Sequence, residues 1–178
     1  MLVELSNLIK EKNEVESKIA KIIGRPANIG HIGEYIAATI FLIQLEESAT
    51  NKGSDGYFTA GELEGSTVDI KLYSKRQNML DINPRALPDY FLVMTGPKTG
   101  LTSSRGTTAP LCIESVYLFN ARELIPALKS KIGIATSVPA ALWEQAEIYP
   151  HQNNNALILT EEQKKLIGLF NSLDPSLY

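Results

Sequence analysis

The chain has 178 residues, of which 44% are hydrophobic and 21% charged, and its formal net charge is −3 at pH 7. This size and composition predict one globular domain, and they exclude a protein that coats nucleic acid through a large positive charge. The single cysteine, Cys112, excludes a disulfide framework and favours a reducing, cytoplasmic location. The sequence shows neither a signal peptide nor an apolar run long enough to span a bilayer, so we expect no membrane partner.

Residues 2–23 are predicted to form an amphipathic helix. Its apolar positions recur at helical spacing and are Leu5, Leu8, Val15, Ile19 and Ile22. Two partners for this stripe remain open, namely the rest of the domain and a second copy of the chain in a homodimer. Gly24 and Pro26 end the helix.

A second helix is predicted over residues 32–46, and it is apolar nearly all round, which is typical of a helix buried on most sides. Glu34 is its only charged residue before Glu46. A carboxylate on a buried helix is costly unless it is paired or binds a cation. Glu34 is therefore either a helix-start residue that favours the positive end of the dipole or a member of a site.

A β-hairpin is predicted next, with strands near residues 55–59 and 66–73 joined by a turn that is flanked by glycines. The midpoint between Asp55 and Asp69 falls inside this turn, so we expect the two carboxylates to lie opposite each other. Because side chains alternate along a strand, Lys71 shares the face of Asp69.

The remaining elements follow in chain order. Residues 90–94 form a continuous apolar run, which indicates a strand buried on both faces. The later expectations are a polar loop over 98–110, strands over 111–119 and 156–159, a helix over 121–129, a short helical turn within an irregular stretch over 132–148, and a final helix from a capping box at 160–163 to about 172.

Asp55, Asp69 and Lys71 together support metal-dependent chemistry. Paired carboxylates bind Mg²⁺, with Mn²⁺ as a substitute, and the metal activates a bound water. Lys71 would orient or help to deprotonate that water and offset charge in the transition state. Glu34 and the backbone carbonyl of Ile70 are further candidate metal ligands. The alternative is that Asp69 and Lys71 form an exposed ion pair of small energetic value.

In this order of features the chain resembles the restriction-endonuclease-like PD-(D/E)XK nuclease superfamily. The matching residues are Glu34 on a helix, Asp55 after Ser54, and the triplet that runs from Asp69 to Lys71. The resemblance covers about residues 28–95. Ser54 stands where the family often has proline, and Asp69 stands where glutamate is usual.

The resemblance implies an α/β fold, bordering on α+β, with a restriction-endonuclease-like core and a mixed central sheet flanked by helices. It divides a single domain of residues 1–178 into an N-terminal helix (1–27), a catalytic core (28–95) and a C-terminal part (96–178). The implied activity is metal-dependent cleavage of phosphodiester bonds, and the alternative is a catalytically inactive nucleic-acid-binding or assembly module of the same fold.

DNA is the expected partner, with RNA left open. The net negative charge does not exclude this, since a bound metal neutralises the carboxylates before the phosphate arrives. The side chains expected to contact nucleic acid follow the site strand or lie in polar loops, and they are Lys52, Lys75, Arg76, Gln77, Lys98 and Arg105.

Overall fold

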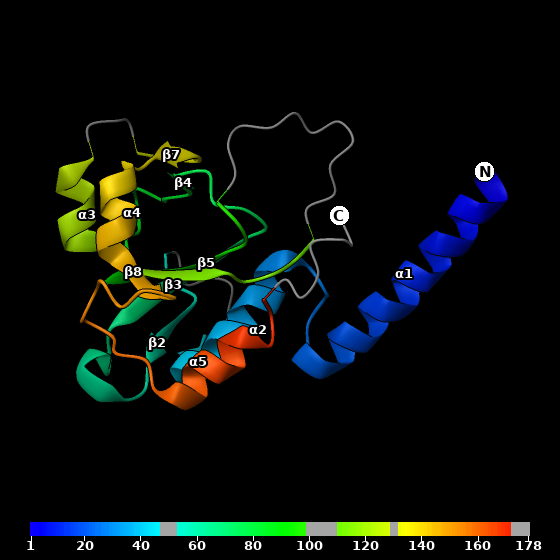
Figure 1. The fold of residues 1–178 in the computed structure, drawn as a ribbon, viewed down its shortest axis with the longest axis horizontal. Coiled ribbons are helices and arrows are strands. Elements are labelled where there is room, and N and C mark those ends of the chain that lie inside the picture. The colour runs from blue at the N-terminus through cyan, green and yellow to red at the C-terminus, as the bar shows by residue number, and fades with distance from the viewer. Residues whose placement is uncertain (47–52, 99–109, 129–131, 172–178) are drawn as a thin grey trace.

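A six-stranded mixed sheet forms the centre of the molecule (Figure 1). The computed structural model describes residues 1–46, 53–98, 110–128 and 132–171. In spatial order the strands are β1 (Ile43–Leu45), β2 (Gly56–Phe58), β3 (Thr67–Tyr73), β5 (Tyr90–Thr95), β6 (Ser115–Asn120) and β8 (Glu147–Tyr149). A separate two-stranded sheet pairs β4 (Met79–Leu80) with β7 (Thr136–Ser137).

Helices lie on both faces of the central sheet, as Figure 1 shows. The helices are α1 (Leu2–Ile23), α2 (Ile29–Phe41), α3 (Ala121–Ala127), α4 (Ala140–Ala146) and α5 (Glu161–Gly168). Helices α2 and α5 contribute to one core cluster with the sheet, and α3 and α4 contribute to the other. The expected α/β class with a mixed sheet flanked by helices is confirmed.

The sheet is mixed because β3 and β5 run parallel, while all its other neighbouring strands run antiparallel. Strand β5 is buried on both faces, as predicted. Leu92 and Met94 belong to the core beneath α2, and Phe91 and Val93 belong to the core beneath α3 and α4. Such a strand reads as a continuous apolar run in the sequence because neither face meets water.

Helix α2 is anchored to β3 at one close contact. Asn28 caps the helix by accepting a hydrogen bond from His31 N. At Gly33, a Cβ would lie 2.7 Å from Leu72 Cβ, so only glycine lets the helix approach the strand this closely. The helix ends where Leu42 adopts the left-handed conformation with φ 55°. The prediction of a helix over 32–46 was therefore wrong at its end, because residues 43–45 form strand β1.

Helix α1 has the predicted bounds and ends at Gly24, whose φ of 70° places it in the left-handed region. None of its residues is buried, and Figure 1 shows it reaching away from the sheet and its covering helices. Among the described residues, no helix is both long and apolar enough to cross a membrane.

The C-terminal part holds more regular structure than the sequence suggested. The stretch over 132–148 contains β7, α4 and the start of β8. The capping box is confirmed, since the side chains of Thr160 and Gln163 each accept from the other's backbone N–H. Residues 156–159 are not a strand, which corrects that expectation. Most of the predicted loop over 98–110 lies outside the described residues.

Candidate functional site

Asp55, which directly precedes β2, lies opposite Asp69 of β3. The ladder pairs Gly56 with Val68 and Tyr57 with Thr67, so the next step of the register sets Asp55 opposite Asp69. The backbone continues this pairing, since Asp55 N donates to the carbonyl oxygen of Val68 at 2.9 Å. The cross-strand juxtaposition expected from the midpoint of the hairpin is therefore present.

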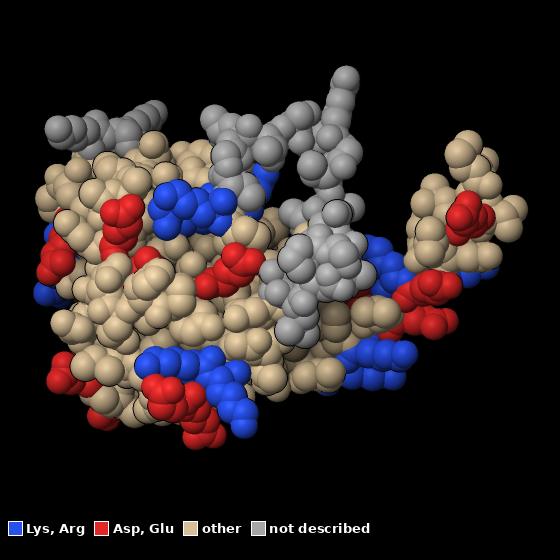
Figure 2. All heavy atoms as spheres, viewed as in Figure 1, with Lys and Arg blue, Asp and Glu red and all other residues tan. Residues whose placement is uncertain are grey.

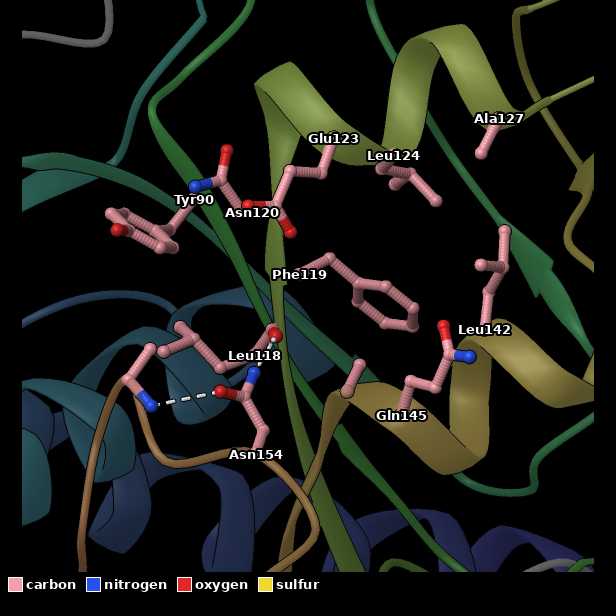
Figure 3. A pocket seen from close by; sticks show the side chains of 12 residues that line it. Tyr90, Leu118, Phe119, Asn120, Glu123, Leu124, Ala127, Leu142, Gln145 and Asn154 are labelled. Carbon is pink, nitrogen blue, oxygen red and sulfur yellow. Dashed lines mark hydrogen bonds between the residues drawn. The ribbon is translucent and has the colours of Figure 1, made fainter.

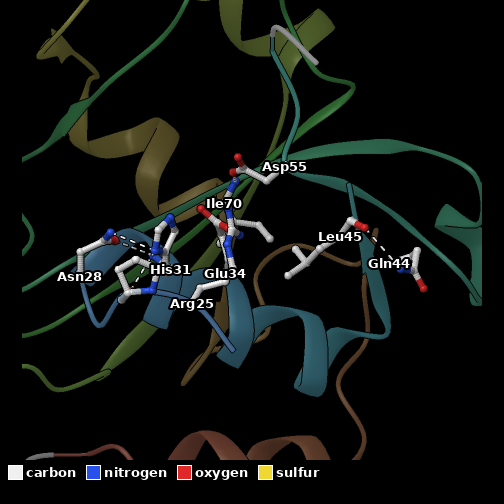
Figure 4. Close-up of polar contacts among 9 residues, drawn as sticks. Arg25, Asn28, His31, Glu34, Gln44, Leu45, Asp55 and Ile70 are labelled. Atoms are coloured by element: carbon white, nitrogen blue, oxygen red, sulfur yellow. Dashed lines mark hydrogen bonds and ion pairs between the residues drawn. The ribbon is translucent and has the colours of Figure 1, made fainter. Parts of the chain in front are cut away.

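The Asp55 carboxylate is held against β3 by a backbone group. Ile70 N donates to Asp55 Oδ2 at 2.7 Å, and Figure 4 shows this contact between the two labelled residues. A hydrogen bond from a backbone N–H to a charged acceptor is stronger than a neutral one, so it orients the carboxylate. The second strand thus positions the acid that the first strand carries.

Asp69 and Lys71 share one face of β3, and Val68, Ile70 and Leu72 occupy the opposite face in the core beneath α2. Lys71 Nζ lies 2.5 Å from Asp69 Oδ1. The Asp69 side chain is only 12% exposed. Oδ1 is buried, and beyond this ion pair it accepts no hydrogen bond within the described part of the chain. The site therefore contains a buried carboxylate oxygen whose partner among the described residues is the Lys71 ammonium.

Burial raises the pKa of Asp69 from its ordinary value of 3.8 to about 7. Lys71 acts in the opposite direction by its charge and by hydrogen bonding, and the Asp55 carboxyl raises the pKa further. Two carboxyls that sit this close do not ionise together easily. A divalent cation between them would remove the repulsion, which is the electrostatic setting of a metal-binding carboxylate pair.

A cavity of about 400 Å³ is lined by Asp69 and Lys71 together with Asp81, Asn83 and Gly133. Asp81 is not among the site residues predicted from the sequence. Its Oδ1 accepts from Ala135 N at 2.7 Å, and Asp81 N donates to the Tyr73 hydroxyl at 3.2 Å. These bonds fix a third carboxylate in the wall of the cavity.

The position of Tyr73 is the one sequence feature that relates to Asp81. It follows Lys71 by two residues, so strand periodicity places it on the face of Asp69 and Lys71. Burial raises its pKa, and the negative charges of Asp81 and Asp69 raise it further. The phenol therefore stays neutral and keeps its hydrogen for donation. Asp81 directly follows β4, in a stretch where apolar and polar residues do not alternate regularly. No sequence pattern therefore marked it.

Glu34 is placed differently from the other three site residues. Its carboxylate pairs with Arg25 (Figure 4), and α2 packs against the Leu72 face of β3, which is opposite to the face of Asp69 and Lys71. Glu34 is not among the groups that shift the pKa of Asp69. Within the described ranges, no three His, Cys, Asp or Glu side chains are grouped to hold a metal ion. The structure thus brings together Asp55, Asp69 and Lys71 but leaves Glu34 with Arg25.

Of the expected nucleic-acid contacts, Arg76 is buried and serves the core. Its guanidinium lies 5.5 Å from the ring centroid of Tyr117 and 5.6 Å from that of Trp143. The expectation that Arg76 is exposed in a basic turn is therefore wrong. Lys98 is exposed, and Lys75 and Gln77 are half-buried. Lys52 and Arg105 lie outside the described residues.

A second cavity, of about 430 Å³, lies beside α3 and α4 and is shown in Figure 3. Its polar side chains are mostly amides, such as Gln145 and Asn154. Asn154 is committed to the fold, because it donates to the carbonyl oxygen of Leu118 and accepts from Ala156 N. This cavity offers no paired carboxylates and no lysine, so the reactive groups lie in the cavity over Asp69.

The residues present fit a hard divalent cation. Asp55 and Asp69 supply oxygen ligands, which Mg²⁺ and Mn²⁺ prefer, and the buried Asp69 Oδ1 is paired with Lys71. The carbonyl of Ile70 remains a predicted ligand beside them. Comparison with protein-family models finds no match, and comparison with curated proteins finds none either.

Proposed function

We propose that this chain is a metal-dependent nuclease that hydrolyses phosphodiester bonds in DNA. The observation that carries the proposal is the placement of Asp55 opposite Asp69, with Lys71 on the same face as Asp69 and a cavity above. Bound Mg²⁺ would supply an activated water and polarise the scissile phosphate. The buried, unpaired Cys112 supports a reducing, cytoplasmic setting for the activity.

The protein groups divide the remaining work. Asp55 and Asp69 would hold the cation, and the Ile70 N–H keeps the Asp55 carboxylate in place. Lys71 Nζ would donate to a phosphate oxygen and offset the negative charge of the transition state. Asp81 lines the same cavity as Asp69 and Lys71, and its backbone N–H donates to the Tyr73 hydroxyl.

The order of elements supports the resemblance to the restriction-endonuclease-like superfamily. A helix that carries Glu34 precedes a hairpin that carries Asp55 and Asp69, and a central strand, β5, follows in parallel with β3. Glu34 is paired with Arg25 on the helix that covers the opposite face of β3, so the proposal rests on Asp55, Asp69 and Lys71.

The second candidate function is a nucleic-acid-binding or assembly module that does not cleave. Two ion pairs favour it, because Lys71 is paired with Asp69 and Glu34 is paired with Arg25. In a module of this kind the pairs would be permanent, and the site would bind neither metal nor water for catalysis. The two functions differ in their response to Mg²⁺ or Mn²⁺.

The test is a cleavage assay with Mg²⁺ and with Mn²⁺ on plasmid, single-stranded DNA, branched DNA and RNA. We expect cleavage of at least one DNA substrate, its abolition by EDTA, and its abolition by Lys71→Ala. Lys165→Ala is the matched control, since this lysine is exposed on α5, remote in sequence from the site. Equal cleavage by wild type and Lys71→Ala would refute the mechanism. Intact substrates and no binding of Mn²⁺ would favour the module.

A further inference from the structure

We propose that α1 is a dimerisation helix, which pairs in antiparallel orientation with α1 of a second copy of this chain. The starting observation is that a helix of 22 residues, about 33 Å long, has no fully buried residue, and that Ile19 and Ile23 in its C-terminal half are half-buried. Leu5, Leu8, Val15 and Ile22 are each between 51% and 68% exposed. Exposing a row of apolar side chains to water is unfavourable, so this face of α1 is expected to pack against another surface.

The spacing of the stripe is that of a coiled coil. Alternating steps of three and four residues define a and d positions, and these hold Leu5, Leu8, Lys12, Val15, Ile19 and Ile22. Lys12 is the one polar residue among them, and it pairs with Glu16 on the same helix. A lone polar residue at an a position is typical of helices that specify register and partner number.

The charges beside the stripe select the orientation. In a parallel pair, Glu11 would face the partner's Glu16, and this repulsion would occur twice. In an antiparallel pair, Glu11 would instead face the partner's Lys18, and this attraction would occur twice. Figure 2 shows acidic and basic side chains intermixed along α1. The antiparallel arrangement is therefore the one in which the two copies complement each other.

The body of the protein supplies the rest of the interface. An apolar groove of about 360 Å³ lies where the C-terminal half of α1 meets α2, and its walls include Ile19, Ile22, Ile32 and Tyr35. Antiparallel pairing with Leu8 beside the partner's Ile19 sets Leu5 beside the partner's Ile22. The N-terminal half of each α1 would thus enter the groove of the other copy. Three heptads alone are marginal in water, and the groove adds the apolar area that a stable dimer needs.

The charge balance of α1 favours a second copy over a lipid surface. The helix carries the same number of acidic as basic side chains, and they are Glu4, Glu11, Glu14 and Glu16 against Lys10, Lys12, Lys18 and Lys21. Helices that lie on anionic membranes are instead rich in lysine and arginine on the polar face. A protein partner with both signs of charge fits the helix better, and α1 itself is such a partner.

The test is sedimentation velocity of the full chain across a concentration series, without nucleic acid or metal. We expect a reversible dimer for the wild type. Glu11→Lys and Lys18→Glu should each raise the dissociation constant roughly tenfold, because each reversal turns two attractions into repulsions. The double variant should restore the wild-type value. Lys10→Glu is the control, because Lys10 lies on the side of α1 away from the a and d positions. This change should leave the dissociation constant unaltered.

Other outcomes would overturn the proposal. A wild type that stays monomeric at all concentrations would do so, as would a monomer that sediments with anionic vesicles. Tighter dimers in Glu11→Lys alone would indicate a parallel pair. Disulfide crosslinking of α1 variants in a Cys112→Ala background tests the orientation of the two helices independently. Disulfide formation should require a mixture of Leu8→Cys and Ile19→Cys chains, whereas a disulfide dimer from Leu8→Cys alone would count against the antiparallel arrangement.

Discussion

Asp55 reaches across the hairpin to the backbone of β3, where Ile70 N donates to its carboxylate, and this places it beside the buried carboxyl of Asp69. One acid is thereby oriented by a backbone hydrogen bond, and the other is desolvated. The two carboxyls therefore lie in different environments although they are neighbours across the hairpin. Lys71 supplies the only positive charge among the groups that shift the pKa of Asp69.

The raised pKa of Asp69 predicts a pH dependence of stability in the absence of divalent metal. Between pH 3.8 and about 7 the folded state retains a proton that the unfolded state releases. The free energy of unfolding should therefore fall as pH rises through this window. Asp69→Asn lacks the titration, so above pH 7 it should be more stable relative to wild type than at pH 4, by on the order of 2 kcal/mol. Urea denaturation in EDTA at several pH values measures this.

Asp89 gives a control of opposite sign. Hydrogen bonds from Thr67 N and Oγ1 hold the pKa of Asp89 below its usual value. Asp89 therefore contributes stability at neutral pH that is lost as pH falls through its folded pKa. Asp89→Asn should be destabilised most at neutral pH and least in acid. Parallel pH profiles for the Asp69 and Asp89 variants would contradict both assignments.

Metal binding should depend on Asp69. Since the carboxylate pair supplies the charge that attracts the cation, Asp69→Asn should weaken Mn²⁺ binding by at least roughly tenfold in calorimetric titrations. Glu162→Gln is a matched change of one carboxylate to an amide on the exposed first turn of α5, and it should leave the titration unchanged. An unaltered titration for Asp69→Asn would remove Asp69 from the metal site.

The close approach of α2 to β3 makes a prediction about two glycines of the same helix. Gly33→Ala would place a Cβ 2.7 Å from Leu72 Cβ, so the helix must shift, and we expect a loss of stability of about 1–3 kcal/mol. Gly30→Ala meets only Asn28 Oδ1 at 3.4 Å, so it should be neutral or stabilising, because alanine is the better helix former. Thermal unfolding of both variants measures the difference.

The hairpin was predictable because local rules decide it. The glycine-flanked turn set the register, and the alternation of side chains put Lys71 on the face of Asp69. Strand β1 was missed because Ile43–Leu45 continues the apolar run of α2, and the helix ends at Leu42 without a glycine or proline. Asp81 was missed because its position depends on contacts with Ala135 and Tyr73. Contacts of this kind have no signature in sequence spacing.

The placement of Arg76 is the clearest case of a tertiary contact that overrides a sequence pattern. It lies in a polar, basic stretch, yet its guanidinium donates to the Tyr117 hydroxyl at 3.0 Å and to Asn78 Oδ1 at 3.1 Å. Lys75 beside it is half-buried and has no comparable set of contacts in the described part of the chain. The two neighbours therefore have different roles, one in the core and one at the surface.

This difference yields a prediction that separates stability from nucleic-acid binding. Arg76→Ala removes a buried cation from two aromatic rings, and we expect it to lower the free energy of unfolding by about 2–4 kcal/mol. Lys75→Ala should change stability by no more than about 0.5 kcal/mol and should weaken DNA binding if Lys75 contacts phosphate. Urea denaturation and a DNA titration of both variants measure the two effects. An Arg76→Ala protein as stable as the wild type but impaired in DNA binding would show that Arg76 belongs to the nucleic-acid surface after all.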